Sequence, residues 1–280
     1  MENKKVWFVT GASKGLGLSL VKKLLNNGDW VAATSRNADD LTKAVGTNDN
    51  FLPLAVDLVN EQSVEKAIGQ TISKFGKIDV VVNNAGYGLL GALEELTDEE
   101  SRENFNVNVF GSLNVIRKAL PQLRKQQSGH IFNISSIGGF TGNFPGFGIY
   151  CASKFAVAGF SESLAAEVKS FGIKVTVVEP GYFRTSFLSS GSLAVPANAI
   201  EAYKEVRDSQ DAHQNHINNQ QAGDPDKAMD VLIKVANTEQ APMHLFLGAD
   251  AYEAANTKIE AVKTDMKNWE TLATATNIED

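Results

Sequence analysis

Apolar residues in this chain gather in short runs that alternate with longer segments of mixed polarity. Seven of these runs have the length and composition of β-strands, and they cover residues 6–9, 30–34, 51–56, 80–83, 130–134, 173–178 and 244–247. Val80, Val81 and Val82 are apolar at consecutive positions, which is typical of a strand covered on both faces of a sheet. The pattern therefore favours parallel pairing.

Segments of helical length separate these strands. Residues 16–27 and 61–75 each stop at a glycine, as helices commonly do. Residues 98–127 are long enough for one helix that is broken or kinked near Pro121. Because strand and helix alternate without a linker, we expect one domain over residues 1–280, of the α/β class. Its sheet should be doubly wound and mostly parallel, with helices on both faces.

Two regions interrupt this alternation. Residues 182–223 are polar and carry little strand pattern. A long irregular insertion of this kind is often a functional lid, and we expect this one to cover a substrate. Residues 249–280 predict an amphipathic helix with a polar tail, which would form a C-terminal helical extension.

The composition is that of a soluble globular protein, with 43% hydrophobic and 21% charged residues. A formal net charge of −7 argues against a nucleic-acid partner, because such proteins need a concentrated positive surface. No apolar run exceeds four residues, so we expect no membrane-spanning helix. Cys151 is the only cysteine, which fits the reducing cytoplasm. We expect no metal site, since His213 and His216 have no cysteine pair to complete a zinc site.

The chain between the first predicted strand and the first predicted helix is rich in glycine. It reads Thr10-Gly11-Ala12-Ser13-Lys14-Gly15-Leu16-Gly17. Without β-carbons the backbone can turn sharply and approach a pyrophosphate, while the helix N-terminus offers free N–H groups and a positive dipole end. In this position the turn predicts a dinucleotide-binding site.

The end of the second predicted strand bears on the choice of dinucleotide. A carboxylate about 20 residues after the glycines normally binds the adenosine ribose of NAD, but this strand ends with Arg36 and Asn37. The Arg36 guanidinium can donate two hydrogen bonds to a 2′-phosphate, and Lys14 can add a second positive charge. We therefore expect NADP(H), with NAD(H) as an alternative because Asp39 and Asp40 follow closely.

Tyr150 and Lys154 lie four positions apart in a segment, residues 150–171, that has the pattern of a helix. At this spacing both side chains can point into one cleft. A free phenol has a pKa of about 10, and a nearby ammonium lowers the pKa because it favours the phenolate. The pair therefore suggests that Tyr150 is a general acid–base.

Further polar residues stand at the ends of predicted strands, where open α/β sheets bind ligands. Ser135 and Ser136 follow the fifth strand, and a serine there can hydrogen-bond a substrate carbonyl. Asn84-Ala85-Gly86 follows the fourth strand, with a glycine that permits close approach of a cofactor. Asn108 lies inside a predicted helix, where asparagine is unfavourable without a specific role.

Together these motifs resemble those of the short-chain dehydrogenase/reductase family, in the family's order and near its usual spacing over residues 4–190. The matching segments are residues 10–17, 83–86, Asn108, Ser136, Tyr150 with Lys154, and Pro180-Gly181. The resemblance implies a Rossmann-like fold with seven parallel strands. It also implies hydride transfer between a nicotinamide and a carbonyl or alcohol carbon.

The resemblance implies roles for single residues as well. Tyr150 would exchange the proton on the substrate oxygen, and Lys154 would lower the pKa of this tyrosine and bind the nicotinamide ribose. Ser136 would position the substrate oxygen, and Asn108 would anchor a water that relays protons. The residues implied to bind the cofactor are Gly11, Ser13, Lys14, Gly15, Leu16, Gly17, Arg36, Asp57, Leu58, Asn84, Ala85, Gly86, Tyr150, Lys154, Pro180, Gly181 and Thr185.

One spacing departs from the family pattern. Ser136 precedes Tyr150 by fourteen positions, about one more than is usual, in a loop that is rich in glycine. Ser135 therefore stays an alternative for the residue that faces the substrate, although the order of the strand favours Ser136.

We thus expect an NADP(H)-dependent oxidoreductase acting on a carbonyl or secondary alcohol of a hydrophobic small molecule. The resemblance implies a homodimer or homotetramer. Two alternatives remain, a non-catalytic NADP(H)-sensing regulator and a sugar-nucleotide epimerase or dehydratase. Sensors of this kind usually lack the tyrosine or the lysine, and the epimerases usually begin with a different glycine spacing than Gly11, Gly15 and Gly17.

Overall fold

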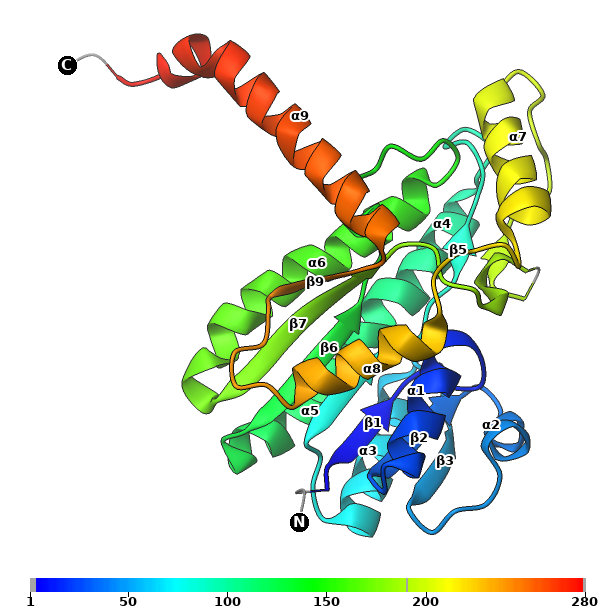
Figure 1. Cartoon of the computed structure of the whole chain (residues 1–280), viewed down its shortest axis with the longest axis vertical. Coiled ribbons are helices and arrows are strands. Elements are labelled where there is room, and N and C mark those ends of the chain that lie inside the picture. Colours follow the sequence, from blue (N-terminus) through cyan, green and yellow to red (C-terminus); the bar gives the residue numbers. More distant parts are fainter. Residues whose placement is uncertain (1–3, 190, 279–280) are drawn as a thin grey trace.

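A sheet of seven parallel strands lies at the centre of the molecule, in the order β3-β2-β1-β4-β6-β7-β9 (Figure 1). The computed structural model describes residues 4–189 and 191–278. The strands of the sheet are β1 (Val6–Val9), β2 (Trp30–Ser35), β3 (Phe51–Ala55), β4 (Val80–Asn83), β6 (Gly129–Ile134), β7 (Ile173–Pro180) and β9 (His244–Leu247). The predicted doubly wound α/β class is confirmed, and all seven predicted strands are present.

Helices bury both faces of this sheet, which explains why its strands are apolar at successive positions. In β1, Trp7 and Val9 point into one core and Phe8 points into the other. The helices that contribute to the first core are α1 (Gly15–Asn26), α2 (Ala38–Val45) and α8 (Pro225–Ala236). Those that contribute to the second are α3 (Glu61–Phe75), α5 (Gly111–Gln126) and α6 (Gly148–Val168). Figure 1 shows α1 and α8 in front of the sheet.

The long helix expected over residues 98–127 is interrupted, but not at Pro121. It consists of α4 (Asp98–Phe105), a π-helical turn η1 (Asn106–Phe110) and α5, and α5 continues through Pro121. The prediction of a break near the proline is therefore wrong. The interruption lies instead at η1, where the side chain of Asn108 bonds to backbone outside the helix. Such π-helical turns often occur at functional sites.

Two helices outside residues 182–223 had not been predicted, although both carry sequence signals. The Asn37 side chain caps α2 by accepting a hydrogen bond from the N–H of Asp39. Asp224 caps α8 in the same way, and Pro225 occupies its first turn, where a missing N–H costs nothing. Both helices could thus have been recognised from the residues at their N-termini.

The segment of residues 182–223 contains little of the sheet, as expected, but it holds helical structure. It includes α7 (Lys204–Asp211), a π-helical turn η5 (Ala212–Ile217) and the short strand β8 (Leu193–Ala194), which pairs with β5 (Gly88–Leu89). An ion pair between the buried Glu95 and the partly buried Arg207, with an N–O distance of 2.8 Å, connects α7 to the rest of the molecule. Burial raises the pKa of Glu95, but hydrogen bonds from Ile200 and Ala92 and the charge of Arg207 more than offset this, so the net pKa is lowered.

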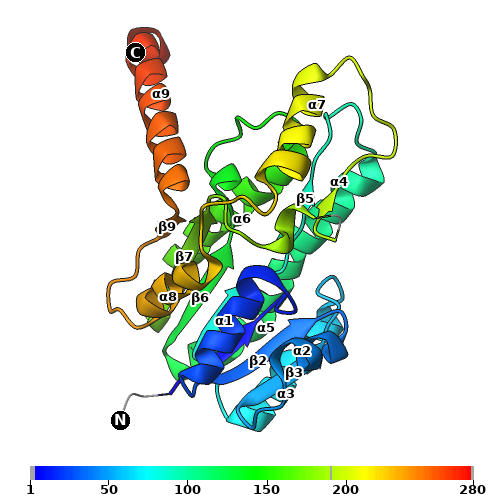
Figure 2. The same ribbon diagram turned by 45° about the vertical axis from the view of Figure 1, so that its right-hand side comes forward.

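The C-terminal part of the chain forms α9 (Ala249–Thr274), a helix of 26 residues. Figures 1 and 2 show that it extends away from the rest of the molecule. Within this helix the buried residues are Ala251 and Ala255, both in its first two turns. No helix in the described part of the chain is both long enough and apolar enough to cross a bilayer.

Candidate active site

A cavity of about 640 Å³ lies where the carboxyl ends of β1, β2, β4, β6 and β7 meet. The carboxyl ends of parallel strands share one edge of the sheet, so residues distant in sequence converge there. The cavity is lined by every residue that was predicted to bind the cofactor or to catalyse, apart from Gly17 and Asn108. Those two lie behind its wall and are fully buried.

The glycine-rich turn can form only without side chains at two of its positions. Gly11 has a φ of +63° and Gly15 a φ of +59°, a region that residues with a β-carbon rarely adopt. A β-carbon on Gly11 would lie 2.7 Å from the Cα of Ala85, and one on Gly17 would lie 2.5 Å from the Asn84 amide nitrogen. The glycines therefore bring the turn into direct contact with the loop that follows β4.

Hydrogen bonds hold this turn and the β4 loop together. The Asn84 amide donates to the carbonyls of Thr10 and Gly11, and the Thr10 hydroxyl accepts from the N–H groups of Asn84 and Ala85. No side chain caps the N-terminus of α1 in the described structure. Its free N–H groups and positive dipole end therefore fit the pyrophosphate of a dinucleotide.

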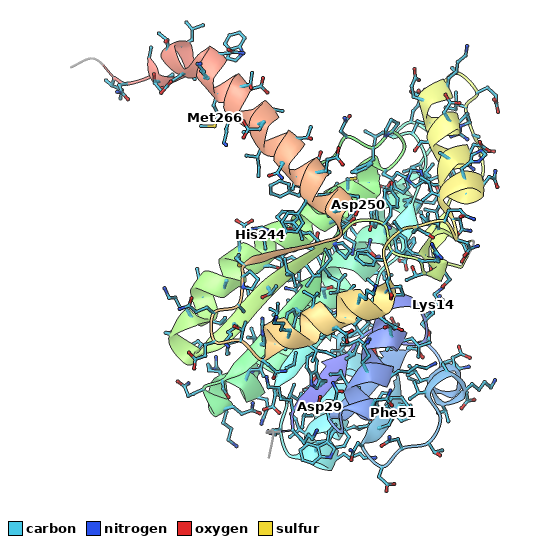
Figure 3. The ribbon with its side chains drawn as sticks, in the orientation of Figure 1. Lys14, Asp29, Phe51, His244, Asp250 and Met266 are labelled. Carbon is cyan, nitrogen blue, oxygen red and sulfur yellow. The ribbon has the colours of Figure 1, made fainter. Side chains whose placement is uncertain are left out.

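One cation lies in this turn and a second lies close to it. Lys14 and Arg36 both line the cavity, and Figure 3 shows Lys14 near the end of α8. Burial lowers the pKa of Lys14, and the positive charge of Arg36 adds to this effect, so the two cations lie close enough to repel each other. Asp39 and Asp40 stand in the first turn of α2 and do not line the cavity. The site at the end of β2 is therefore positive, as a phosphate requires.

The other residues implied to bind the cofactor lie along the same cavity. Asp57 and Leu58 follow β3, and the Asp57 carboxylate accepts a hydrogen bond from the N–H of Val59. Pro180 and Gly181 end β7. Thr185 faces the glycine-rich turn, since a β-carbon on Gly15 would lie 3.7 Å from the Cβ of Thr185. The residues expected to contact the two halves of a dinucleotide therefore line one continuous cavity.

Tyr150 and Lys154 project from the first turns of α6 and are both buried. The Lys154 ammonium lies 5.8 Å from the centre of the Tyr150 ring and donates a hydrogen bond of 2.9 Å to the carbonyl of Ile134. Burial lowers the pKa of Lys154 to about 8. Both side chains thus reach one cavity, as their spacing predicts.

The pKa of Tyr150 shifts in the direction opposite to the expected one. Burial raises it above the usual value of a phenol, because the phenolate loses its hydration. A hydrogen bond with Ser136 lowers it in part, while the neighbouring Cys151 and Tyr182 add to the increase. Tyr150 is therefore a neutral phenol at neutral pH, which is the form that donates a proton.

Ser135 and Ser136 occupy different environments. The Ser135 hydroxyl is buried and donates a hydrogen bond of 2.9 Å to the carbonyl of Lys154. The Ser136 hydroxyl lies beside Tyr150 and accepts from the N–H of Gly138. A β-carbon on Gly138 would lie 3.4 Å from the Ser136 oxygen and 3.6 Å from the Tyr150 ring. The geometry thus favours Ser136 as the serine available to a ligand.

Both the oxygen and the nitrogen of the Asn108 side-chain amide form hydrogen bonds within the protein. Its oxygen accepts from the N–H of Tyr87, and its nitrogen lies within hydrogen-bond distance of Tyr87, Asn104 and Ser153. A β-carbon on Gly86 would lie 2.9 Å from the Asn108 oxygen and 3.4 Å from the Lys154 nitrogen. Asn108 therefore holds the β4 loop in place next to Lys154.

The wall opposite Tyr150 comes largely from residues 182–223, and sequence analysis did not predict a place in it for His213 or Gln221. The Nδ1 of His213 donates a hydrogen bond to the carbonyl of Ser209, and its Nε2 shares a hydrogen bond of 2.8 Å with the Tyr182 hydroxyl. Burial raises the pKa of Tyr182 to about 12. Gln221 is also buried here, and its amide has no hydrogen-bond partner in the described structure. The apolar members of the wall are Phe144, Phe147, Phe187, Leu188 and Leu193.

No group of three potential metal ligands occurs among residues 4–189 and 191–278. His216, which was weighed with His213 as a zinc ligand, lies on the surface and contacts Asp211. Burial raises the pKa of the Cys151 thiol to about 11, which leaves little thiolate at neutral pH.

The comparison with known sequences agrees with this geometry. The family model for short chain dehydrogenases matches residues 5–193. Oxidoreductase BOA17 of Botryotinia fuckeliana is 38% identical over 97% of this chain and 98% of its own length. The 3-ketodihydrosphingosine reductase of Bacteroides thetaiotaomicron is 42% identical over 72% of this chain and 72% of its own length.

Solved structures show the same relationship. A short-chain dehydrogenase from Streptomyces avermitilis superposes with a TM-score of 0.90 and 35% identity, over 99% of this chain and 100% of that one. ElxO with NADP bound has a TM-score of 0.73 and 27% identity, over 90% and 100% of the two chains. A 3-ketoacyl-(acyl-carrier-protein) reductase from Brucella melitensis, complexed with NADH, has a TM-score of 0.72 and 25% identity, over 87% and 96%. With its seven parallel strands, its glycine-rich turn and its tyrosine–lysine pair, the chain belongs to the short-chain dehydrogenase family of oxidoreductases.

Proposed function

We propose that this protein is an NADP(H)-dependent reductase or dehydrogenase that acts on a carbonyl or secondary alcohol group of a hydrophobic small molecule. The observation that carries the proposal is the convergence of Ser136, Tyr150 and Lys154 on one cavity, beside a turn shaped for a dinucleotide. A protein that only senses the nucleotide has no need for a buried proton donor next to a hydroxyl and a cation.

The reaction follows from the positions of these three side chains. A bound nicotinamide cofactor supplies the hydride to the carbonyl carbon, or accepts it from the alcohol carbon. In reduction, the neutral Tyr150 phenol gives its proton to the oxygen of the carbonyl, and the Ser136 hydroxyl holds that oxygen in place. The Lys154 ammonium stabilises the phenolate that Tyr150 becomes, and it can hold ribose hydroxyls at the same time. In oxidation the proton moves from the alcohol to Tyr150.

The proposed choice of NADP(H) rests on charge. Lys14 and Arg36 face the cavity at the end of β2, whereas Asp39 and Asp40 do not. A guanidinium and an ammonium together can neutralise much of the charge of a 2′-phosphate. Related structures hold NADP in one case and NADH in another, so the family alone leaves this choice open.

The proposed substrate is hydrophobic because residues 182–223, which we propose as a substrate-binding lid, bring several large apolar side chains to the cavity. Phe187, Leu188 and Leu193 belong to this segment, and Phe144 and Phe147 meet them from the other side. The relative from Bacteroides thetaiotaomicron is named for a substrate with a keto group. A ketone attached to an apolar body therefore fits the cavity best.

The single-domain organisation over residues 1–280, the cytoplasmic location and the homo-oligomeric state belong to the same proposal. Cys151 is buried and needs no oxidising compartment. The fold and the cavity require no second domain.

The test is a panel of ketones, aldehydes and quinones with apolar substituents, incubated with the purified protein and NADPH labelled with deuterium at C4. We expect oxidation of NADPH and transfer of the label to the carbonyl carbon of at least one compound. Tight NADPH binding without oxidation across the panel would contradict the proposal and favour a regulator. Turnover of sugar nucleotides alone, with no net change in NADPH, would favour an epimerase or dehydratase.

The activity is expected to depend on the charge of Lys154. Because burial lowers the pKa of Lys154 to about 8, its ammonium is present below that pH and is lost as the pH rises through it. The Tyr150 phenol stays protonated over the same range, because burial raises its pKa. We therefore expect kcat/KM for NADPH to fall above about pH 8.

The measurement is kcat/KM between pH 6 and pH 10, which reports groups of the free protein. Lys154→Met serves as the control, since its activity should be low and lack this alkaline decrease. A wild-type profile that stays level through pH 9 would exclude Lys154 as the titrating group.

A further inference from the structure

Tyr182, His213 and Gln221 form a polar corner in the wall that residues 182–223 contribute to the cavity. Tyr182 and His213 share a hydrogen bond, and the His213 ring contacts the Phe147 ring, with 4.8 Å between their centres. His213 and Gln221 are almost fully buried, with 7% and 3% of their surface exposed. The proposed proton transfer uses none of the three, so their burial beside the cavity needs another explanation.

The backbone places Tyr182 and Gln221 on two paired stretches of the chain. A parallel β-bridge joins Phe183 to Gly223, and the N–H of Gly223 donates to the carbonyl of Tyr182. The Nε of Arg184 donates to the carbonyl of Gln221 over 3.0 Å. These contacts hold the two residues in adjacent segments of the cavity wall, although they are distant in the sequence.

The hydrogen bonds of His213 determine what the Tyr182 hydroxyl can offer to a ligand. The Nδ1 of His213 lies 2.7 Å from the carbonyl of Ser209, which can only accept, so Nδ1 carries a hydrogen. In the neutral ring Nε2 is then an acceptor, and the Tyr182 hydroxyl donates its hydrogen to it over 2.8 Å. Burial raises the pKa of Tyr182 to about 12, so the hydroxyl keeps this hydrogen at neutral pH. Toward the cavity the Tyr182 oxygen is therefore an acceptor.

The amide of Gln221 has unused hydrogen-bonding capacity. Its oxygen and its nitrogen are both buried and have no hydrogen-bond partner among residues 4–189 and 191–278. Gln126, a partly buried glutamine, instead donates to the carbonyl of Ile78 and accepts from its N–H. A buried amide without partners destabilises a protein, and most such groups are paired. An amide that lines a cavity and lacks internal partners is therefore available to a ligand.

The polar corner lies close to the proposed proton donor. The Phe147 ring contacts the Tyr150 ring as well as that of His213, with 6.0 Å between the centres of the Phe147 and Tyr150 rings. Tyr182 is near enough to Tyr150 to raise its pKa. One ligand in the cavity of about 640 Å³ can therefore present an oxygen to Tyr150 and a second polar group to the corner.

We propose that the polar corner binds a hydroxyl group of the substrate, separate from the carbonyl or alcohol group that reacts. This hydroxyl donates its hydrogen to the Tyr182 oxygen and accepts a hydrogen bond from the Gln221 amide. A carboxylate cannot donate to Tyr182 and an ammonium cannot accept from Gln221, whereas a hydroxyl does both. The inference rests on the proposed function, and it defines the substrate class as apolar hydroxyketones and the corresponding diols.

The burial of the corner makes it selective. A ketone without the hydroxyl would leave the Gln221 amide unpaired, and a site built to bind a hydroxyl discriminates strongly against an analogue that lacks it. His213 is a positioning residue, because it takes the hydrogen of Tyr182 and so makes the Tyr182 oxygen an acceptor.

The test compares 2-decanone with the hydroxy-2-decanones that carry a hydroxyl at successive carbons from C4 to C10. Their affinities are measured by titration calorimetry with the full-length protein and NADP⁺, which has no hydride to reduce the ketone. We expect affinity to pass through a maximum along the series, because the corner lies at a fixed distance from Tyr150. The best hydroxyketone should bind at least about tenfold more tightly than 2-decanone. With NADPH, kcat/KM should follow the same order.

Two variants each remove one partner of the hydroxyl. Gln221→Met and Tyr182→Phe should each lower the affinity ratio of the best hydroxyketone to 2-decanone to less than about threefold. Gln220→Met is the matched control, because Gln220 is an exposed neighbour that does not line the cavity, and it should leave the ratio unchanged. Gln221→Met should also raise Tm by about 2–4 °C, because it removes a buried unpaired amide.

The methyl ether of the best hydroxyketone tests the role of His213. An ether accepts from Gln221 but has no hydrogen for Tyr182, so we expect the wild-type protein to bind it at least about fivefold less tightly than the hydroxyketone. His213→Phe releases the Tyr182 hydrogen, which can then be donated to the ether, so the difference should shrink to less than about twofold. A merely structural role of His213 would weaken the binding of both ligands alike.

Three results would overturn the proposal. They are the absence of any hydroxyketone that binds more tightly than 2-decanone, an affinity ratio that neither Gln221→Met nor Tyr182→Phe changes, and a lower Tm in Gln221→Met. Failure of the proposed function would look different, since a hydroxyketone would bind through Gln221 but cause no oxidation of NADPH. Equal kcat/KM for 2-decanone and every hydroxyketone would instead support the reductase and contradict the hydroxyl site.

Discussion

Replacing Tyr150 by phenylalanine is expected to lower kcat about a thousandfold, while the affinity for NADPH changes by less than about threefold. General acid catalysis by a positioned side chain contributes typically about 10² to 10⁴ in rate, and Tyr150 is the buried phenol beside Ser136 and Lys154. Phenylalanine keeps the ring that packs against Phe147 and Phe187 but has no proton to give. The substitution therefore preserves the shape of the cavity and removes the proton donor.

The two effects are measured separately, kcat by NADPH oxidation with the best substrate of the panel and affinity by fluorescence titration. Tyr182→Phe is the matched control, because Tyr182 is a second buried tyrosine of the same cavity. We expect this control to alter KM for the substrate far more than kcat. A Tyr150→Phe variant that retains a tenth of the wild-type kcat would show that another group donates the proton.

Replacing Arg36 by aspartate is expected to raise KM for NADPH at least about tenfold and to leave KM for NADH unchanged or lower. The substitution removes a guanidinium that can bind a 2′-phosphate with two hydrogen bonds, and it introduces a carboxylate that repels the phosphate. The same carboxylate can accept hydrogen bonds from the ribose hydroxyls of NADH. Arg36 is exposed at the mouth of the cavity, so the change should not affect folding.

Steady-state kinetics with both cofactors give the ratio of KM for NADPH to KM for NADH, which shows whether Arg36 binds the 2′-phosphate. Lys43→Asp is the matched control, because Lys43 is an exposed cation in α2 that does not line the cavity. It tests whether a change of net charge alone weakens NADPH binding. If the ratio of KM for NADPH to KM for NADH stays the same in the Arg36 variant, then Lys14 or a backbone group binds the 2′-phosphate instead.

Much of the fold could be predicted from local patterns, because the sheet is buried on both faces. Trp7, Phe8 and Val9 face alternate cores, and this requirement makes successive positions of a central strand apolar. The turn around Gly11 and Gly15 was equally visible, since its backbone needs positive φ angles that favour glycine. Helix α8 was missed even though Asp224 and Pro225 mark its beginning.

The break in the helix after Asp98 shows where local rules mislead. Proline was expected to interrupt it, but α5 accommodates Pro121 and the chain departs from α-helical geometry at Asn106–Phe110 instead. There the amide of Asn108 bonds to Tyr87, a residue 21 positions away. A contact between residues so far apart in the sequence produces no periodic pattern from which it could be predicted.

The order of residues along the chain was thus sufficient for the parallel sheet, the nucleotide-shaped turn and the shared face of Tyr150 and Lys154, because each depends on a repeat or a backbone angle of a few neighbouring residues. Packing between distant segments decided the rest. Packing places the Ser135 hydroxyl against a backbone carbonyl and leaves Ser136 beside the phenol. It also makes the desolvation of Tyr150 outweigh the hydrogen bond from Ser136, so the pKa of this tyrosine rises. Those outcomes depend on how completely water is excluded and on which side chains meet, and both are properties of the folded chain as a whole.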